Sequence, residues 1–260
     1  MKTRIITILL GIALLIGIAL LPSEEPMTVS VLDVGKADCI VLQHQGIVFM
    51  IDTAEAEDYD KVTAFLQNEG ITQIDYLLIT HFDKDHVGGA AQLLADYTVL
   101  QVIQPDYSKE SDPRTEYETA LAACGITPLT LTDDTVLPLG DATFTLLPTH
   151  QTYDEEEDNN YSILLSVAYN GSDLLFMGDA KKKRVEEFLE TDSNTYDFIK
   201  FPAHGAYHKA IDDLLDQTQP ECVAITCSNK YPADQDTLDE LAARDITVYQ
   251  TVDGNVQLTF

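Results

Sequence analysis

The segment Thr80-His81-Phe82-Asp83-Lys84-Asp85-His86-Val87-Gly88-Gly89 places two histidines and two aspartates within six residues. It directly follows an apolar run at residues 76–79, which predicts a buried strand. On a turn that leaves a strand these side chains can converge, and mixed imidazole and carboxylate ligands suit Zn²⁺, Mn²⁺ or Fe²⁺. A solvated acidic turn with incidental histidines is the alternative interpretation. Gly88 and Gly89 permit close backbone approach behind such a site. The predicted ligands are His81, Asp83, Asp85 and His86.

Two further potential ligands follow apolar strands in the second half of the chain. Asp179 comes after the run at residues 174–177 and Gly178, and His204 follows the run at residues 198–201 within a Pro-Ala-His-Gly turn. Either residue alone would be commonplace. Three strand ends with compatible ligand types in one chain predict a shared metal site.

Short β-rich runs alternate with helical stretches in both halves of the sequence. Two such halves without a Pro/Gly/Ser-rich linker predict one α/β (α+β) domain at residues 27–260. We expect an αββα sandwich, in which two mixed β-sheets pack face to face with helices outside. Strands are predicted at residues 28–34, 39–43, 47–51, 76–79, 99–103, 142–147, 162–169, 173–177, 198–201, 222–226, 248–250 and 256–260. Helices are predicted at residues 59–68, 88–97, 115–124, 180–190, 212–217 and 237–244, and a polar loop at 106–114.

Residues 1–26 form a separate segment with the pattern of an export signal and a short tether. Lys2 and Arg4 precede an apolar stretch at residues 5–21, and acidic residues follow it. The stretch reaches the lower limit for a membrane-spanning helix and lacks an evident cleavage site, which favours an uncleaved anchor over a cleaved signal peptide. The charge distribution predicts that the domain lies outside the cell membrane, or is secreted if the segment is cleaved.

The acidic composition of the chain restricts which partners it can bind. The chain has 260 residues with 44 acidic and 15 basic side chains, and a formal net charge of -29. A field of this sign repels polyanions at long range, so we expect no tight non-specific DNA binding. A nucleic-acid substrate would need a local exception.

Six motifs in order carry a resemblance to a known family. The motifs are Val31-Leu32-Asp33-Val34-Gly35-Lys36-Ala37-Asp38, Met50-Ile51-Asp52-Thr53, the His81 segment, Asn159-Asn160-Tyr161-Ser162-Ile163, Phe176-Met177-Gly178-Asp179-Ala180 and Pro202-Ala203-His204-Gly205. With these motifs, residues 27–260 resemble metallo-β-lactamase-fold proteins similar to the extracellular domain of the DNA-uptake protein ComEC. Asp83 points to this ComEC-like branch, because most metallo-β-lactamases have a histidine at its position.

The resemblance implies a centre with two divalent ions, Zn²⁺ or Mn²⁺. His81 and Asp83 would bind one ion, while Asp85, His86 and His204 would bind the other, with Asp179 bridging them; Asp85, Asp179 and His204 would be the catalytic residues. Outside the ligands, Asp33, Asp38 and Asp52 would orient the ligands, and Asn160 and Ser162 would line the pocket as hydrogen-bond donors. His150 lies where other branches carry a further metal histidine, and a loop histidine is the alternative interpretation.

These features predict a metal-dependent hydrolase that cleaves a phosphodiester, in a nucleic acid or a small molecule such as a nucleotide, with a metal-bound hydroxide as the nucleophile. Hydrolysis of a thioester, lactone or β-lactam on the same scaffold is one alternative. Ala203 motivates another, because the family usually has a histidine there. In that alternative the domain retains the metal but acts as a non-catalytic binding module at the cell surface.

Overall fold

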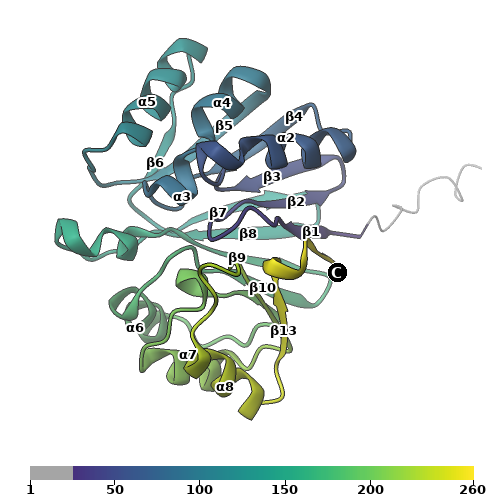
Figure 1. Cartoon of the computed structure of the whole chain (residues 1–260), viewed down its shortest axis with the longest axis vertical. Coiled ribbons are helices and arrows are strands. Elements are labelled where there is room, and N and C mark those ends of the chain that lie inside the picture. The colour runs from purple at the N-terminus through teal and green to yellow at the C-terminus, as the bar shows by residue number, and fades with distance from the viewer. Residues whose placement is uncertain (1–25) are drawn as a thin grey trace, which may run out of the picture.

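Two mixed β-sheets pack face to face in the computed structural model, which describes residues 26–260 (Figure 1). Within this part of the chain each sheet has seven strands, antiparallel in one half and parallel in the other. The first sheet has the order β14 (Val256–Thr259), β1 (Thr28–Val31), β2 (Ile40–His44), β3 (Ile47–Ile51), β4 (Gln73–Leu78), β5 (Thr98–Pro105) and β6 (Leu129–Leu131). The second has the order β13 (Thr247–Gln250), β12 (Cys222–Ile225), β11 (Phe198–Lys200), β10 (Ser172–Phe176), β9 (Leu164–Tyr169), β8 (Ala142–Leu147) and β7 (Thr135–Leu139).

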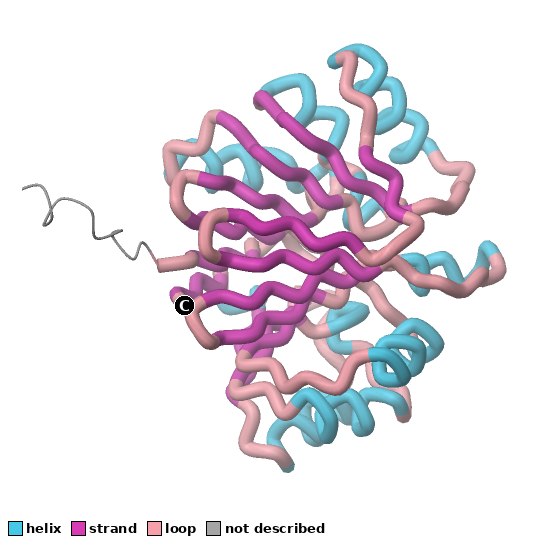
Figure 2. The backbone as a smooth tube through the Cα atoms, turned by 180° about the vertical axis from the view of Figure 1, so that it is seen from behind, coloured by secondary structure: helices cyan, strands magenta, loops and turns pink. Residues whose placement is uncertain are grey.

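Helices cover the outer face of each sheet, as the views from both sides show (Figures 1 and 2). On the first sheet lie α2 (Tyr59–Asn68), α3 (Lys84–Val87), α4 (Ala90–Asp96) and α5 (Asp112–Cys124), and on the second α6 (Lys182–Thr191), α7 (Ala210–Thr218) and α8 (Gln235–Ala243). Short 3₁₀ helices are η1 (Ala56–Asp58), η2 (Glu155–Tyr161), η3 (Pro202–Gly205) and η4 (Thr251–Asp253). This arrangement confirms the predicted αββα sandwich.

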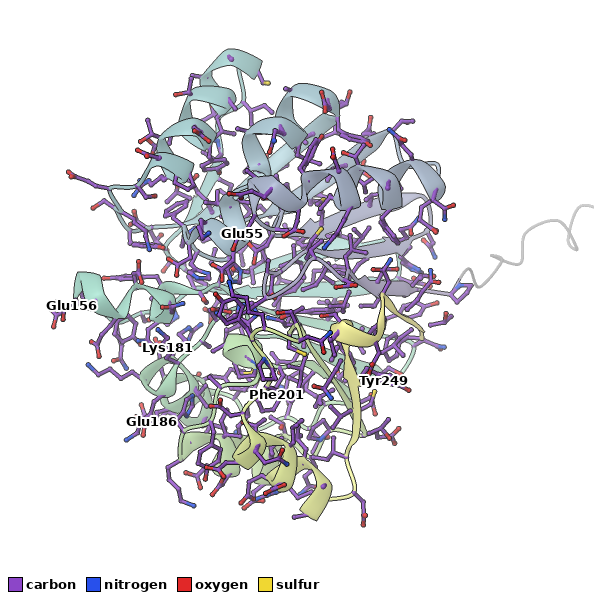
Figure 3. The ribbon with its side chains drawn as sticks, in the orientation of Figure 1. Glu55, Glu156, Lys181, Glu186, Phe201 and Tyr249 are labelled. Atoms are coloured by element: carbon purple, nitrogen blue, oxygen red, sulfur yellow. The ribbon has the colours of Figure 1, made fainter. Side chains whose placement is uncertain are left out.

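Three apolar cores hold these layers together. One core lies between the sheets and includes Phe49 from the first and Phe144 from the second, whose ring centroids are 5.0 Å apart. The other two cores join each sheet to its own helices. Buried Phe201 belongs to the core of the second sheet, whereas exposed Glu156 and Glu186 lie at the periphery (Figure 3).

Parallel pairing brings the predicted metal ligands to one edge of the sandwich. In the second sheet Phe176 of β10 pairs with Lys200 of β11, so the loops with Asp179 and His204 leave the same edge. In the first sheet β3 and β4 are parallel, and the segment with His81 leaves β4 close to the end of β3. The fold therefore gathers ligands that are far apart in sequence.

Some predicted elements differ from the structure. The helix predicted at residues 88–97 is the shorter α4, at residues 90–96, and a separate short helix that was not predicted, α3, precedes it at residues 84–87. The polar loop predicted at residues 106–114 ends early: the side chain of Ser111 accepts a hydrogen bond from Arg114 N and caps α5. Strands β6 and β7 were not predicted, because β6 has only three residues and β7 contains Pro138, which is unfavourable in a strand.

The export segment predicted at residues 1–26 falls, except for Pro26, outside the described residues. Between residues 26 and 260 no helix has the length and apolar character needed to cross a bilayer.

Candidate metal centre

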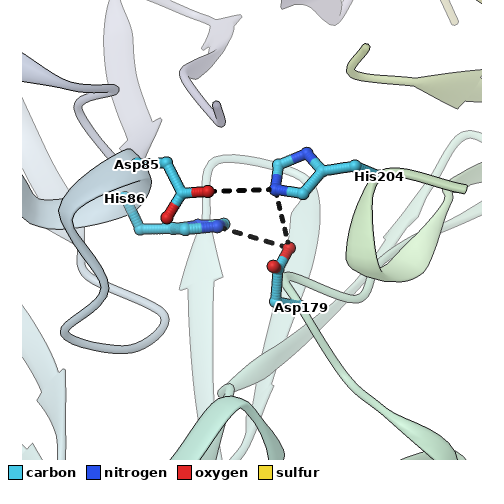
Figure 4. A group of neighbouring side chains, drawn as sticks. All are labelled: Asp85, His86, Asp179 and His204. Carbon is cyan, nitrogen blue, oxygen red and sulfur yellow. Dashed lines mark ion pairs between the residues drawn. The ribbon is translucent and has the colours of Figure 1, made fainter. Parts of the chain in front are cut away.

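Four predicted ligands converge between the two halves of the sandwich (Figure 4). Asp179 Oδ1 lies 3.3 Å from His86 Nε2 and 3.2 Å from His204 Nε2, and His204 Nε2 lies 3.6 Å from Asp85 Oδ2. One ligand atom from each of these residues lies within 4.8 Å of the others. Two carboxylates and two imidazoles at this spacing can surround a single divalent ion.

Three of these atoms are buried without a hydrogen-bond partner: His86 Nε2, Asp179 Oδ1 and His204 Nε2. An unsatisfied buried polar atom costs about 1–3 kcal/mol. Three such atoms aimed at one another need a common partner, and a divalent cation can accept electron pairs from all of them. The residues of this site therefore fit the metal that the sequence predicts.

The charged groups of this site shift one another's pKa values. Burial alone would lower the pKa of His86, but the Asp179 and Asp52 carboxylates raise it well above its ordinary value. Burial would raise the pKa of Asp179, but His204 and His86 hold it well below its ordinary value. Because a histidine must be neutral at the nitrogen that binds a metal, a divalent ion would compete with protons at this site.

Asp52 orients His86. Its carboxylate accepts hydrogen bonds from Thr80 N at 2.7 Å and Thr80 Oγ1 at 2.6 Å, and lies 2.7 Å from His86 Nδ1. His86 Nδ1 carries the hydrogen that it donates to this carboxylate. The other ring nitrogen, Nε2, therefore points to the centre with a lone pair that can bind a metal. Asp52 also has a positive φ of 55°, a backbone conformation that costs energy and is retained at this functional position.

Asp38 stabilises His204 through Thr226. The Thr226 hydroxyl donates to Asp38 Oδ1 at 2.7 Å, and His204 Nδ1 lies 2.9 Å from that hydroxyl oxygen and 3.1 Å from Thr226 O. Both oxygens can accept from Nδ1, which leaves His204 Nε2 for a metal. Asp38 is also paired with Lys200, a fully buried cation that donates to Gly178 O at 3.2 Å.

The predicted ligands His81 and Asp83 have other partners. His81 Nε2 lies 3.7 Å from Asp83 Oδ2 and 3.4 Å from Asn159 Nδ2. The Asn159 amide also donates to Asp83 Oδ2 at 3.5 Å and to Asp179 Oδ2 at 3.3 Å. Lys109 forms ion pairs with Asp83 and with Asp158. Burial would lower the pKa of Lys109, but its two carboxylate partners raise it, so the side chain remains a cation.

A cavity of about 740 Å³ adjoins this side of the centre. Lys109 and Asp158 line it and connect it to Asp83. Tyr107 and Tyr161 form part of its wall, with their rings stacked at a centroid distance of 4.4 Å. The cavity is large enough for a small organic molecule beside the metal ligands.

Small residues allow the loops to approach closely. A Cβ atom on Gly89 would lie 2.3 Å from Thr53 O, which agrees with the close approach predicted there. Gly178, directly before Asp179, has a positive φ, and a Cβ atom on it would lie 3.1 Å from the side chain of Ser162. Ser162 Oγ in turn accepts a hydrogen bond from Asp179 N at 3.1 Å, so it supports the ligand loop.

Three predicted site residues lie elsewhere. Asn160 accepts a hydrogen bond from Arg184 N and donates to Glu157 O, so the pocket donor of this motif is its neighbour Asn159. His150 is half-exposed and its Nε2 lies 3.1 Å from Asp134 Oδ1, because its loop is held by Glu187 on α6; it lines the cavity instead of joining the ligand group.

Asp33 is the third. Its backbone N–H donates to Asn255 Oδ1 at 2.7 Å, which ties this strand end to the turn before β14. Of the three aspartates predicted to orient the ligands, Asp38 and Asp52 make such contacts.

The sequence interpretation also missed several residues of this site. Lys200 had a detectable signal, since it is a lysine within the apolar run Phe198-Ile199-Lys200-Phe201. Lys109 had none, because it is one of several charged residues in a polar loop. Asn159 lies in the same motif as Asn160, and the sequence alone does not show which of the two asparagines faces the ligands.

Comparison with known proteins now defines the class. The family model of the metallo-beta-lactamase superfamily matches residues 32–225, and this chain belongs to that superfamily. The chain is 26% identical to ComE operon protein 3 of Bacillus subtilis (strain 168), over 89% of its own length and 33% of that protein. It is also 26% identical to recombination protein 2 of Haemophilus influenzae, over 80% of its own length and 25% of that protein. These relatives confirm the ComEC-like resemblance, although the chain spans only a quarter to a third of their length.

A solved structure confirms the fold independently. The metallo-beta-lactamase fold protein YhfI from Bacillus subtilis superimposes with a TM-score of 0.62 at 12% sequence identity, covering 90% of this chain and all of that chain. Likeness at this identity establishes the fold and leaves the reaction to be argued from the site.

Proposed function

We propose that this chain is a metal-dependent hydrolase that cleaves a phosphodiester and acts outside the cytoplasm. One observation carries the proposal: His86 Nε2, Asp179 Oδ1 and His204 Nε2 are buried, converge and have no hydrogen-bond partner. Asp85 would complete the ligand set for the ion. A divalent ion held there supplies Lewis acidity to the scissile group and lowers the pKa of water.

The residues of the chain have distinct roles in this proposal. Asp52 and Thr226 fix the tautomers of His86 and His204, so that both histidines present Nε2. The Asn159 amide faces Asp83 and Asp179, where it can donate to an oxygen of the substrate. The neighbouring cavity would receive the remainder of the substrate.

A small phosphodiester, such as a dinucleotide or a cyclic nucleotide, fits the molecule better than a long nucleic acid. The net charge of -29 disfavours a polyanion that extends over the surface. Placement outside the cytoplasm is supported by the charged and apolar pattern of residues 1–26.

The test is hydrolysis of bis(4-nitrophenyl) phosphate by the full-length chain loaded with Mn²⁺ or Zn²⁺. Asp179→Asn should lower turnover by at least about 100-fold, whereas Asp213→Asn, an exposed change on α7, should leave it unchanged. Turnover in Asp179→Asn equal to that of the wild type would exclude this site. A parallel panel of a thioester, a lactone and a β-lactam tests the other hydrolase chemistries.

Ala203 favours one second candidate, a metal-retaining binding module without catalysis. This residue replaces the histidine expected from the family and has a positive φ of 45°, with its N–H donating to Gly178 O. Histidine is among the residues that tolerate this region. This candidate is supported if the wild type binds metal without turnover and the Ala203→His variant has turnover. Turnover by the wild type would exclude it.

A further inference from the structure

The two sides of the metal centre are not equivalent. On one side, His86, Asp179 and His204 present unpartnered buried atoms. On the other side, Asp83 already pairs with the ammonium group of Lys109, and Asn159 donates to both Asp83 and His81.

Lys109 is held in this position from two directions. It lies between the carboxylates of Asp83 and Asp158, and about a quarter of its side chain is exposed. Asp158 belongs to η2, and Lys109 to the loop before α5. The contact therefore links two segments and does not depend on neighbours in sequence.

A second divalent ion at Asp83 would meet this ammonium group at short range. Like charges repel strongly where water is partly excluded, and a first ion at Asp179 would add to the repulsion. On the side of His86, Asp179 and His204 the nearby lysines differ from Lys109. Lys36 lies 3.7 Å from Asp85 Oδ2, beyond hydrogen-bond distance, and 40% of its side chain is exposed. A more exposed cation is more effectively screened. Buried Lys200 pairs with Asp38, which is not one of the predicted ligands.

We propose that Lys109 is an internal counter-ion at the position of a second metal, so that this chain holds one divalent ion tightly and a second only when Lys109 leaves Asp83. This inference rests on the proposed metal centre and specifies how it is occupied. Lys109 is a positioning residue here, since it acts through Asp83. Because it also lines the cavity, it can turn from Asp83 toward a bound anion.

The experiment measures Mn²⁺ binding to the full-length chain by titration and by electron paramagnetic resonance, without substrate. The wild type should bind the first ion at least 100-fold more tightly than the second and give the spectrum of an isolated ion. Lys109→Met should reduce this ratio at least tenfold and give the spectrum of an exchange-coupled pair.

Two further variants keep the result interpretable. Lys183→Met removes a lysine of α6 that pairs at 2.7 Å with Glu157 of the same η2 segment and forms no ion pair with a predicted ligand, and it should behave as the wild type. Lys109→Arg retains the cation and should keep the second ion weak. Circular dichroism establishes that each variant is folded.

The outcomes separate this inference from the proposed function. A wild type that binds two ions with equal affinity, or a folded Lys109→Met with the wild-type ratio, overturns the role of Lys109 and leaves the centre intact. Absence of any tight ion in both proteins, or a tight ion that persists in Asp179→Asn, overturns the centre and this inference with it.

Discussion

Asp179 Oδ1 and His204 Nε2 lie 3.2 Å apart, and neither atom has a hydrogen-bond partner. Removal of one of them should therefore weaken metal binding strongly. We expect His204→Ala to lower the affinity for the first Mn²⁺ by at least about 100-fold. Loss of a residue that only hydrogen-bonds to a ligand usually lowers metal affinity by about 10–100-fold. Calorimetric titration measures this affinity.

His150→Ala is the matched control for that substitution. Because His150 contacts Asp134 and lines the cavity, we expect the affinity for the first ion to stay within about twofold of the wild type. A loss as large as that of His204→Ala would restore His150 as a ligand.

Asp52 should control metal affinity through His86. Asn replaces Asp with nearly the same shape and tolerates the positive φ of this position. It presents a neutral amide to His86 Nδ1, so we expect Asp52→Asn to lower affinity for the first ion about 10–100-fold. Asp60→Asn, an exposed change on α2, should have no effect in the same titration. Equal affinities for both variants would contradict the orienting role.

The buried pair of Lys200 and Asp38 should be important for stability. Lys200→Met leaves the Asp38 carboxylate buried without its ammonium partner, and breaking such a pair costs about 3–5 kcal/mol. Urea unfolding of the metal-free chain measures this loss. Lys183→Met removes an exposed lysine and should change the free energy of unfolding by less than about 1 kcal/mol. A loss of that small size in Lys200→Met would show that Asp38 does not depend on Lys200.

Glu187 provides a pH-dependent contribution away from the ligands. Burial would raise its pKa, but Arg184 and hydrogen bonds from Thr149, His150 N and Tyr153 lower it below the ordinary value of 4.5. A carboxyl with a lowered pKa in the folded state stabilises the protein fully above its unfolded pKa. This contribution is then lost as the pH falls through the lower folded pKa.

We therefore expect Glu187→Gln to destabilise the protein by about 1–3 kcal/mol at pH 7, and the difference from the wild type to diminish as the pH falls below about 4.5. Urea unfolding at pH 7, 4.5 and 3.5 measures it. Glu186→Gln, at the exposed neighbouring position, should differ little from the wild type at each pH. A difference for Glu187→Gln that is constant over this range would contradict the assigned pKa direction.

Local patterns predicted the framework of this molecule because strands and helices have distinct apolar periods. The same patterns placed Asp179 and His204 at strand ends, and parallel pairing then brings those ends together. The contacts of Asn159 and Lys109 with Asp83 join segments 76 and 26 residues apart, so they depend on how loops pack. No local pattern contains that information.

His150 shows that the order of motifs alone does not determine which side chains join the ligand group. Its position in the motif order matched a ligand of other branches, but Glu187 holds its loop against α6 by accepting from His150 N at 2.7 Å. A histidine at the expected position in the motif order can thus face a neighbouring cavity and not the metal ligands.

Anomalous scattering from crystals of the Mn²⁺-loaded protein tests the central claim most directly. We predict one strong peak within coordination distance of Asp85, His86, Asp179 and His204, and a weaker peak, or none, beside Asp83 and Lys109. A strong peak outside the four-residue group, with none inside it, would contradict the proposed metal centre.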